Sequence, residues 1–473
     1  MPIRKRLPNV SDQYIAPNSR VKKSMLALAN LLGRSEHMKH AFFLHTGYGK
    51  TKLILDKIMN TIPRPRVLLI STKNIIESAW GAEIEKWYPN KLTYGYITGG
   101  VKVKDRMKII NKQYDILGIN TSMLDWFIKN TVSVKAKKYT KQGIKYQYNV
   151  EELIERFDLL VIDESSLFKN YRSERFKLLK QWAYKVKNVF ILSATPTPKN
   201  IEDVWSQIYL LDGGKRLGKN ITAFRDRFAI PEVINGGITL YRYTQKATTE
   251  VLKLIQDITT SVPKPATPLF PEPTVVKTFI KPDPDTAKML ADFRKDYVLG
   301  DEIAFSKMQL INKVSQIASG NIYSKDTTIH LNDLKFNALQ KLISKIKTPV
   351  LVTYNYVFDR EKLLTLPGAR LLKEDEDFVA WNNNEIPIGV LSPHSAAHGL
   401  NLQASECRDI IWFSPIWDTE KWIQTNARVC RRGQRYPVTI RVLLLRGSFD
   451  DYAFELCQDK FRVQYNNLNE LKK

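Results

Sequence analysis

The sequence has few cysteines and no long apolar segment. Only three of its 473 residues are cysteines (Cys407, Cys430 and Cys457), and no two of them form a C-x-x-C pair. We therefore expect neither a disulfide framework nor a cysteine-based zinc site. No apolar run reaches the roughly 18 residues that cross a bilayer, and no apolar segment follows the basic N-terminus as it does in a secretory signal. These absences predict a soluble, cytoplasmic protein without a membrane partner.

Acidic residues are also in short supply. Lys and Arg total 73 against 48 Asp and Glu, which leaves a formal net charge of +25. An excess of this size favours a polyanionic partner, because lysines and arginines that neutralise phosphates release condensed counterions. Nucleic acid is the preferred interpretation, and a solvated basic surface or an anionic membrane is the alternative. The apolar share of 43% still suffices for buried cores, and the length predicts about two to four domains.

Short apolar runs of strand length recur along the chain, separated by segments of helical length. Because these runs are apolar on both faces, they predict parallel strands buried in an α/β fold. They are 41–44, 67–70, 116–119, 159–162 and 189–192 in the first half, and 350–352, 388–391, 410–413 and 440–445 in the second. Ligands of such sheets gather at the carboxyl ends of the strands, and the polar motifs described below lie there.

The two groups of strands predict two α/β lobes, residues 1–212 and 331–473. Between them, 213–330 is expected to form a connector with helices at about 222–258 and 285–319. Five prolines between positions 263 and 273 predict an extended stretch within this connector.

A loop with two glycines, Thr46-Gly47-Tyr48-Gly49-Lys50-Thr51, directly follows the first predicted strand and opens a predicted helix at 52–59. Glycines allow backbone N–H groups to surround phosphate oxygens, and a helix N-terminus favours the anion. Lys50 is expected to reach the β- and γ-phosphates of a nucleotide, and the Thr51 hydroxyl to bind magnesium. The usual phosphate-loop pattern begins with a glycine at the position of Leu44.

Two carboxylates, Asp163 and Glu164, end the apolar run 159–162. Asp163 is expected to hold magnesium, and Glu164 to orient and deprotonate the water that attacks the nucleotide. A strand end that merely meets solvent is the alternative, which the phosphate loop upstream disfavours. Ser193-Ala194-Thr195-Pro196 follows the next apolar run and is expected to lie beside the two carboxylates.

In the second half, Gln424, Arg428 and Arg431 occur in a segment predicted to be helical. Arg428 and Arg431 are three positions apart, so we predict them on one helical face. Two guanidinium groups there are suited to stabilise a γ-phosphate as an arginine finger, with Gln424 in support, and a basic helix docked on nucleic acid is the alternative. His394 and His398 have the spacing of metal ligands, but without a third ligand we interpret them as loop histidines.

Alternating apolar and polar residues between 131 and 150 predict a β-hairpin with a glycine near its turn. Six lysines and no acidic residue lie between positions 129 and 145. If the hairpin binds nucleic acid, Lys135, Lys137 and Lys138 are the expected contacts. A solvated surface hairpin is an equal alternative.

These motifs, in this order, resemble those of the superfamily-two helicase-like ATPases, and more closely of their Swi/Snf-type branch. The Swi/Snf character lies in Trp417, in the Gln424-x-x-x-Arg428-x-x-Arg431 spacing and in QIASG at 316–320. DESSLFKN at 163–170 resembles the compact phage-encoded members of this group. The similarity extends over about residues 20–460, although Ser165-Ser166 replaces the more usual Ala-His, and no adenine-reading glutamine is evident near 18–22.

The resemblance implies two RecA-like lobes with ATP and Mg²⁺ between them, and ATP-driven movement on duplex or branched DNA. In a phage-encoded protein such an activity would serve replication, recombination or repair in the host cytoplasm, and one subunit is sufficient for the ATP site. By analogy, the residues expected to contact the DNA backbone are Thr72, Lys73, Asn120, Thr121 and Ser122 in the first lobe, and Tyr354, Asn355, Ser395 and Ala396 in the second.

Two other functions stay open. One is a DNA-binding scaffold with a silent ATPase, which the intact Lys50, Glu164 and Arg431 oppose. The other is an RNA helicase, because the net charge does not distinguish RNA from DNA, although the Swi/Snf-like motifs favour DNA.

Overall fold

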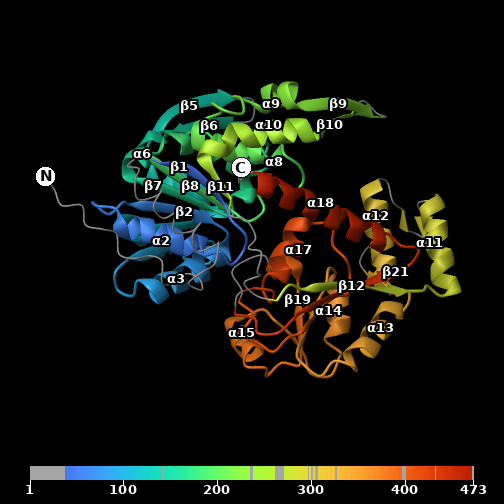
Figure 1. The fold of residues 1–473 in the computed structure, drawn as a ribbon. Helices are drawn as coiled ribbons and strands as arrows, with labels where there is room; N and C mark the ends of the chain where they lie inside the picture. Colours follow the sequence, from blue (N-terminus) through green and yellow to red (C-terminus); the bar gives the residue numbers. More distant parts are fainter. Residues whose placement is uncertain are drawn as a thin grey trace. The chain divides into compact units, whose positions relative to one another are not determined.

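The structure is a computed structural model that describes residues 38–140, 143–234, 238–261, 271–296, 298–299, 302–303, 307–324, 327–396, 401–431 and 433–470. It divides the chain into two units (Figure 1). The first unit comprises Met1–Ala266 with Arg462–Lys473, and the second comprises Thr267–Phe461. The expected connector, 213–330, is therefore shared between the two units.

The first unit is built on a seven-stranded parallel sheet. Its strands are β1 (Lys39–Phe43), β2 (Val67–Ser71), β3 (Tyr94–Ile97), β4 (Ile116–Asn120), β7 (Leu159–Asp163), β8 (Asn188–Ser193) and β11 (Thr259–Ser261). They are ordered β11-β1-β8-β7-β2-β4-β3. The inner strands β2 (VLLIS) and β7 (LLVID) are buried along their whole length. Both faces of the sheet are therefore covered, as parallel sheets require.

Helices and two antiparallel hairpins complete the first unit. The helices are α2 (Lys50–Asn60), a π-helical turn (Ile75–Ala79), α3 (Trp80–Trp87), α4 (Val103–Asn111), α5 (Leu124–Thr131), α6 (Glu151–Arg156), α7 (Glu174–Leu179), α8 (Asp203–Asp212), α9 (Ile221–Phe228) and α10 (Gln245–Ile255). One hairpin pairs β5 (Val134–Thr140) with β6 (Gly143–Tyr148), and the other pairs β9 (Ala229–Ile234) with β10 (Ile238–Tyr243). The helix α8 contacts β1 and β8 and is buried along almost its entire length.

The second unit is built on a six-stranded parallel sheet. Its strands are β12 (Thr274–Ile280), β17 (Val350–Thr353), β18 (Ala369–Leu371), β19 (Ile388–Leu391), β20 (Asp409–Trp412) and β21 (Thr439–Leu445). They are ordered β12-β21-β20-β17-β19-β18. Its helices are α11 (Pro284–Asp296), α12 (Lys307–Ser319), α13 (Leu334–Ile343), α14 (Val357–Leu363), α15 (Asp375–Asn382), α16 (Pro393–Ala396), α17 (Thr419–Asn426) and α18 (Asp450–Glu470), the last of which runs on past Phe461.

The predicted α/β fold with two parallel sheets is confirmed. All nine predicted apolar runs are strands, five in the first sheet and four in the second. Four strands of these two sheets were not predicted, namely β3, β11, β12 and β18, and these are the edge strands. Edge strands lack a neighbour on one side and need not be apolar on both faces, as the polar sequence TTS of β11 illustrates.

The expectation of one helical segment at about 222–258 is wrong in its middle. The helices α9 and α10 flank the hairpin of β9 and β10, in which Ile230 is paired with Arg242. Pro231 lies within β9. Since proline has no N–H to donate and its ring clashes with the preceding helical turn, a helix cannot continue through this position.

Two further features bear on the sequence analysis. No helix in the described part of the chain is long and apolar enough to span a membrane. The three cysteines are buried and carry free thiols.

Candidate active site

The strand order of the first sheet brings three predicted motifs to one edge. The phosphate loop follows β1, the Ser193–Pro196 segment follows β8, and Asp163 ends β7. Because β1, β8 and β7 are consecutive neighbours and parallel, their carboxyl ends lie side by side. The edge of the sheet therefore collects the residues expected to bind and hydrolyse a nucleotide.

The phosphate loop has the backbone conformation that its two glycines predict. Gly47 and Gly49 have φ angles of 80° and 74°, in the left-handed region that favours glycine. The helix α2 begins at Lys50, and Lys50 Nζ donates to the carbonyl of Leu44 at 2.8 Å. Leu44 is fully buried and its N–H donates to the Ser193 carbonyl at 3.1 Å. Leu44 does not have a positive φ, so its backbone conformation does not require the glycine of the usual pattern.

The other residues of the loop differ in exposure. Tyr48 is buried, whereas Thr46 and Thr51 are half-buried. Thr51 lies in the first turn of α2, which has no acidic residue that would repel a phosphate.

Asp163 is a buried carboxylate at the end of β7, with 7% of the residue exposed. Its Oδ2 accepts a hydrogen bond from the Trp80 indole at 2.9 Å, and its Oδ1 accepts one from the Glu164 N–H at 3.0 Å. Burial raises the pKa of the Asp163 carboxyl above its usual range, and the Trp80 hydrogen bond and the charge of Lys50 only partly oppose this. A carboxylate held in this way gains stabilisation from an added cation.

Glu164 and Thr195 lie on the adjacent loops. Glu164 has a φ of 56°, an unusual conformation for a residue other than glycine, and it precedes a 3₁₀ turn at Ser165–Phe168. The Thr195 N–H donates to Ser193 Oγ at 3.0 Å. Thr195 Oγ1 is buried and has no hydrogen-bond partner among the described residues. Unsatisfied buried polar atoms are uncommon, and they occur where a ligand or water completes the site.

The candidate DNA contacts of the first unit gather at the same edge. They are Thr72, Lys73, Asn120, Thr121 and Ser122. The first two follow β2 and the other three begin at the end of β4, and the ladder of these neighbouring strands pairs Ser71 with Asn120. Lys73 is exposed and lies 3.8 Å from Glu77, while Thr72 is buried and its hydroxyl has no partner in the described part of the chain. Asn120 Nδ2 donates to Ser122 Oγ at 2.9 Å.

The hairpin of β5 and β6 presents lysines to solvent. Lys135 and Lys137 are exposed, and Lys135 Nζ lies 3.5 Å from Glu151. Lys138 belongs to β5, but its side chain lies outside the described residues.

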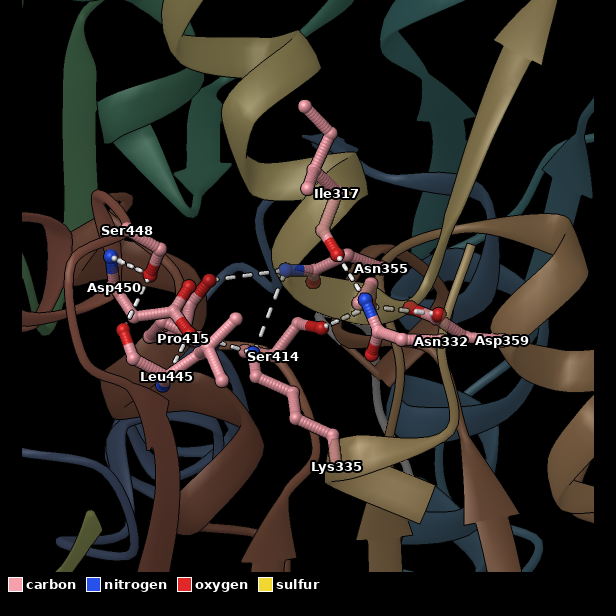
Figure 2. Close-up of polar contacts among 11 residues, drawn as sticks. Ile317, Asn332, Lys335, Asn355, Asp359, Ser414, Pro415, Leu445, Ser448 and Asp450 are labelled. Atoms are coloured by element: carbon pink, nitrogen blue, oxygen red, sulfur yellow. Dashed lines mark hydrogen bonds and ion pairs between the residues drawn. The ribbon is translucent and has the colours of Figure 1, made fainter. Parts of the chain in front are cut away.

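In the second unit, the Asn355 side chain is hydrogen-bonded to the backbone. Its Nδ2 donates to the Pro415 carbonyl at 3.0 Å, and the Ser414 carbonyl lies at 3.5 Å (Figure 2). Tyr354 is half-buried, and burial raises the pKa of its hydroxyl. Ser395 and Ala396 belong to α16, but their side chains lie outside the described residues, as do 397–400 and the segment 18–22.

The expectation that Arg428 and Arg431 share a helical face is wrong. The helix α17 ends at Asn426, and both arginines lie beyond it, outside any helix. Two tertiary contacts end the helix: the Asn426 side chain accepts from the Trp412 indole at 3.0 Å, and the Arg428 carbonyl accepts from the Leu402 N–H at 3.1 Å. Arg431 Nη1 donates to Asn401 Oδ1 at 2.7 Å. Gln424 is buried within α17.

Comparison with known proteins identifies the family of this chain. The SNF2-related domain family matches residues 20–332, which is more than half of the chain. The chain belongs to the SNF2-related family.

Three relatives of this SNF2-related ATPase illustrate the range of the family. Protein p41 of Acyrthosiphon pisum secondary endosymbiont phage 1 is 26% identical over 457 residues, covering 90% of this chain and 94% of that protein. The SWI/SNF-related matrix-associated actin-dependent regulator of chromatin subfamily A member 1 of Mus musculus is 22% identical, covering 88% of this chain and 40% of that protein. The DNA repair and recombination protein RDH54 of Saccharomyces cerevisiae is 25% identical, covering 65% and 38%. The chain thus spans nearly all of the phage protein but less than half of the two eukaryotic ones.

The residues of the first unit fit the ATP and Mg²⁺ that an SNF2-family ATPase uses. The described residues contain no group of three or more His, Cys, Asp or Glu side chains that would hold a metal ion by themselves. Magnesium in nucleotide sites does not need such a group, because it takes one or two protein oxygens and completes its shell with phosphate and water. The Thr51 hydroxyl and the buried Asp163 carboxylate are oxygen ligands of this type.

The second unit of the SNF2-related ATPase contains a buried ionic network that the sequence did not reveal. Lys335 on α13 lies 2.7 Å from Asp450 at the start of α18, and both side chains are almost completely buried. Ser319 Oγ donates to Asp359 Oδ1 at 2.8 Å and lies 2.7 Å from Ser414 Oγ. Figure 2 shows Asp359 and Ser414 close to each other. The network joins elements that are far apart in the sequence, so no local pattern predicts it. It lies next to a cavity of about 260 Å³ that Asn355, Trp417 and Asp450 line.

Proposed function

We propose that this SNF2-related ATPase is an ATP-dependent DNA translocase or helicase that acts on duplex or branched DNA. The observation that carries the proposal is the order of strand ends along the first sheet. The candidate nucleotide residues end β1, β8 and β7, and the candidate DNA contacts end the next two strands, β2 and β4. One rigid sheet edge thus carries both sets, which suits an enzyme that couples hydrolysis to DNA.

In the proposed mechanism, the N–H groups of the phosphate loop and Lys50 hold the β- and γ-phosphates. Thr51 and Asp163 would hold magnesium, which when bound neutralises charge on the phosphates. Glu164 orients the attacking water and accepts its proton. Arg428 and Arg431, with Gln424 in support, are assigned to the charge that develops on the γ-phosphate, an assignment that rests on their place in the Swi/Snf-like motif.

Several features support DNA as the partner. The net charge is +25, and Lys135 and Lys137 are exposed on the hairpin. Two relatives are described as a regulator of chromatin and as a DNA repair and recombination protein. The similarity to a phage protein favours a role in phage replication, recombination or repair. Phosphate contacts position a protein without reading sequence, so we expect little sequence preference.

The experiment that tests the proposal measures ATP turnover at a fixed low salt concentration. Turnover is compared without nucleic acid and with duplex DNA, single-stranded DNA, a four-way junction or RNA, and Glu164→Gln controls for contaminating ATPases. We expect the strongest stimulation by duplex or junction DNA. Stimulation by RNA alone would identify an RNA helicase. Tight DNA binding without turnover above the Glu164→Gln control would identify a DNA-binding scaffold.

Lys50→Ala tests the assignment of the nucleotide site. Because Lys50 is the cation of the phosphate loop, its loss is expected to reduce turnover to the level of Glu164→Gln. DNA binding should be largely retained, because Lys50 lies at the end of β1 and the candidate DNA contacts lie at the ends of β2 and β4. Unchanged turnover in Lys50→Ala would refute the assignment.

A further inference from the structure

Gln207 joins two loops of the candidate active site. It lies on α8 and is fully buried. Ser165 Oγ donates to Gln207 Oε1 at 2.6 Å, and Gln207 Nε2 donates to the Pro196 carbonyl at 2.7 Å. Nε2 also donates to the Asp203 carbonyl, one helical turn earlier, at 2.8 Å. The side chain thus links the loop after β7 to the loop after β8.

The hydrogen bonds fix the orientation of this amide. Both Nε2 hydrogens point to carbonyl oxygens, and Oε1 accepts from a hydroxyl. The reversed amide would place its oxygen against the carbonyls of Pro196 and Asp203, where no donor is available to it. A buried polar side chain with all of its hydrogen-bonding groups satisfied defines one arrangement of its neighbours.

The hydrogen bonds of Gln207 to Ser165 and to Pro196 belong to a longer line of contacts along the carboxyl end of the sheet. On the side of β2, Ser71 Oγ donates to the Asp163 carbonyl at 3.0 Å, two residues before Ser165. On the side of β1, Leu44 donates to the Ser193 carbonyl and Lys50 donates to Leu44. The line thus runs from the end of β2, next to the candidate DNA contact Thr72, to the lysine of the phosphate loop.

We propose that Gln207 is a positioning residue that couples the two loops, so that DNA at the ends of β2 and β4 affects the nucleotide site. The inference rests on the proposed function. In this proposal the hydrogen bond between Ser165 and Gln207 forms part of the link. It lies where this chain has Ser165-Ser166 and the Swi/Snf-type proteins more usually have Ala-His. Gln207 does not contact substrate in this proposal and acts through the loops that it holds.

Binding measurements without turnover test the coupling directly. The Kd of a labelled DNA duplex is measured with and without a non-hydrolysable ATP analogue, and the ratio of the two values is the coupling factor, typically about 5- to 150-fold. Gln207→Leu nearly retains the size of the side chain and removes all three hydrogen bonds of its amide. We expect it to reduce the coupling factor by at least about threefold. We expect a similar fall in the ratio of DNA-stimulated to basal turnover, which does not depend on the fraction of folded protein.

Two serines provide a matched pair of milder variants. Ser165 and Ser206 are both buried, but Ser206 Oγ has no partner among the described residues. Ser165→Ala is expected to reduce the coupling factor, and Ser206→Ala to leave it unchanged. The coupling factor of the double variant Ser165→Ala/Gln207→Leu should be no lower than that of Gln207→Leu alone, because both changes remove the same link.

The outcomes separate this inference from the proposed function. A wild-type protein whose DNA affinity does not respond to nucleotide, and whose turnover does not respond to DNA, would overturn both. If the wild type shows coupling and neither Gln207→Leu nor Ser165→Ala changes the coupling factor, the inference alone is overturned. This holds even if the variants have a lower melting temperature. In that case Gln207 would only stabilise the fold.

Discussion

A buried aspartate lies at the carboxyl end of each of the two sheets, and the two carboxylates have different partners. Asp450 in the second unit has a cation beside it, Lys335 at 2.7 Å, and accepts a backbone hydrogen bond from Leu445 at 2.9 Å. Asp163 in the first unit accepts from an indole and a backbone N–H, and burial raises its pKa. The charge of Asp450 is thus compensated by a neighbouring lysine, whereas that of Asp163 is only partly compensated, by two hydrogen bonds and the charge of Lys50. The comparison separates a carboxylate that is paired within the protein from one that an added cation would stabilise further.

The largest effect is expected from removing the cation of the second unit. Lys335→Met leaves Asp450, and the nearby Asp359, buried without it. Breaking one side of a buried ion pair typically costs about 3–5 kcal/mol. We expect a loss of this size in urea unfolding followed by tryptophan fluorescence. Lys341→Met, an exposed lysine on the same helix, is the matched control and should cost less than about 0.5 kcal/mol. Equal effects would show that Lys335 carries no electrostatic role.

Asp359 predicts a dependence of stability on pH. Burial raises the pKa of its carboxyl to about 7, although the hydrogen bond from Ser319 and the charge of Lys335 oppose the shift. The native state therefore binds more protons than the unfolded state between about pH 4 and pH 7. The free energy of unfolding should fall as the pH rises through this window, by up to about 4 kcal/mol, and this contribution should be constant above it.

Asp359→Asn is the variant that checks this. It keeps the oxygen that accepts from Ser319 but does not titrate. The difference in unfolding free energy between the variant and the wild type should therefore increase from pH 4 to pH 7 in favour of the variant. Parallel pH profiles of the two proteins would contradict the assignment.

The interior of the fold was predictable from the sequence, and its edges and long-range polar contacts were not. Apolar runs identify strands covered on both faces and flanked by neighbours, so β2 and β7 were found and edge strands such as β11 were missed. The candidate nucleotide residues could be proposed from the sequence because their signals are local, with glycines before a helix and carboxylates after a strand. Lys335 and Asp450 are more than a hundred residues apart, and only the folded chain brings them together.

The prediction of where α17 ends was wrong for a different reason. The spacing of Arg428 and Arg431 is compatible with a helix, but the Arg428 carbonyl bonds to Leu402 and the Val429 side chain is buried in the core. Tertiary contacts therefore override the local helical preference. Gln207 gave no signal at all, because a single glutamine in an apolar helix resembles any surface residue until its partners are known.

A smaller effect is expected for the carboxylate of the first unit. Asp163→Asn removes a charge whose burial is unfavourable, but it turns an amide NH₂ toward one of the two N–H donors, Trp80 or Glu164. The two effects oppose each other, so the unfolding free energy of the unliganded protein should change by less than about 2 kcal/mol. The same change should abolish the stabilisation by ATP and Mg²⁺, since a neutral amide is a poor ligand for magnesium. Melting curves with and without nucleotide check both statements. A loss of stability in unliganded Asp163→Asn as large as that in Lys335→Met would contradict the comparison with Asp450.

The smallest effects compare two candidate DNA contacts, one from each unit. Lys73 is exposed, so Lys73→Ala should change the unfolding free energy by less than about 0.5 kcal/mol, yet lower the slope of log Kd against log salt by about 1. Asn355 donates to the Pro415 carbonyl, so Asn355→Ala should cost about 1 kcal/mol of stability. Urea unfolding and duplex binding at several salt concentrations measure both. An unchanged salt slope in Lys73→Ala would show that Lys73 does not contact DNA. An Asn355→Ala variant as stable as the wild type would show that the candidate DNA contact of the second unit contributes no more to stability than Lys73 does.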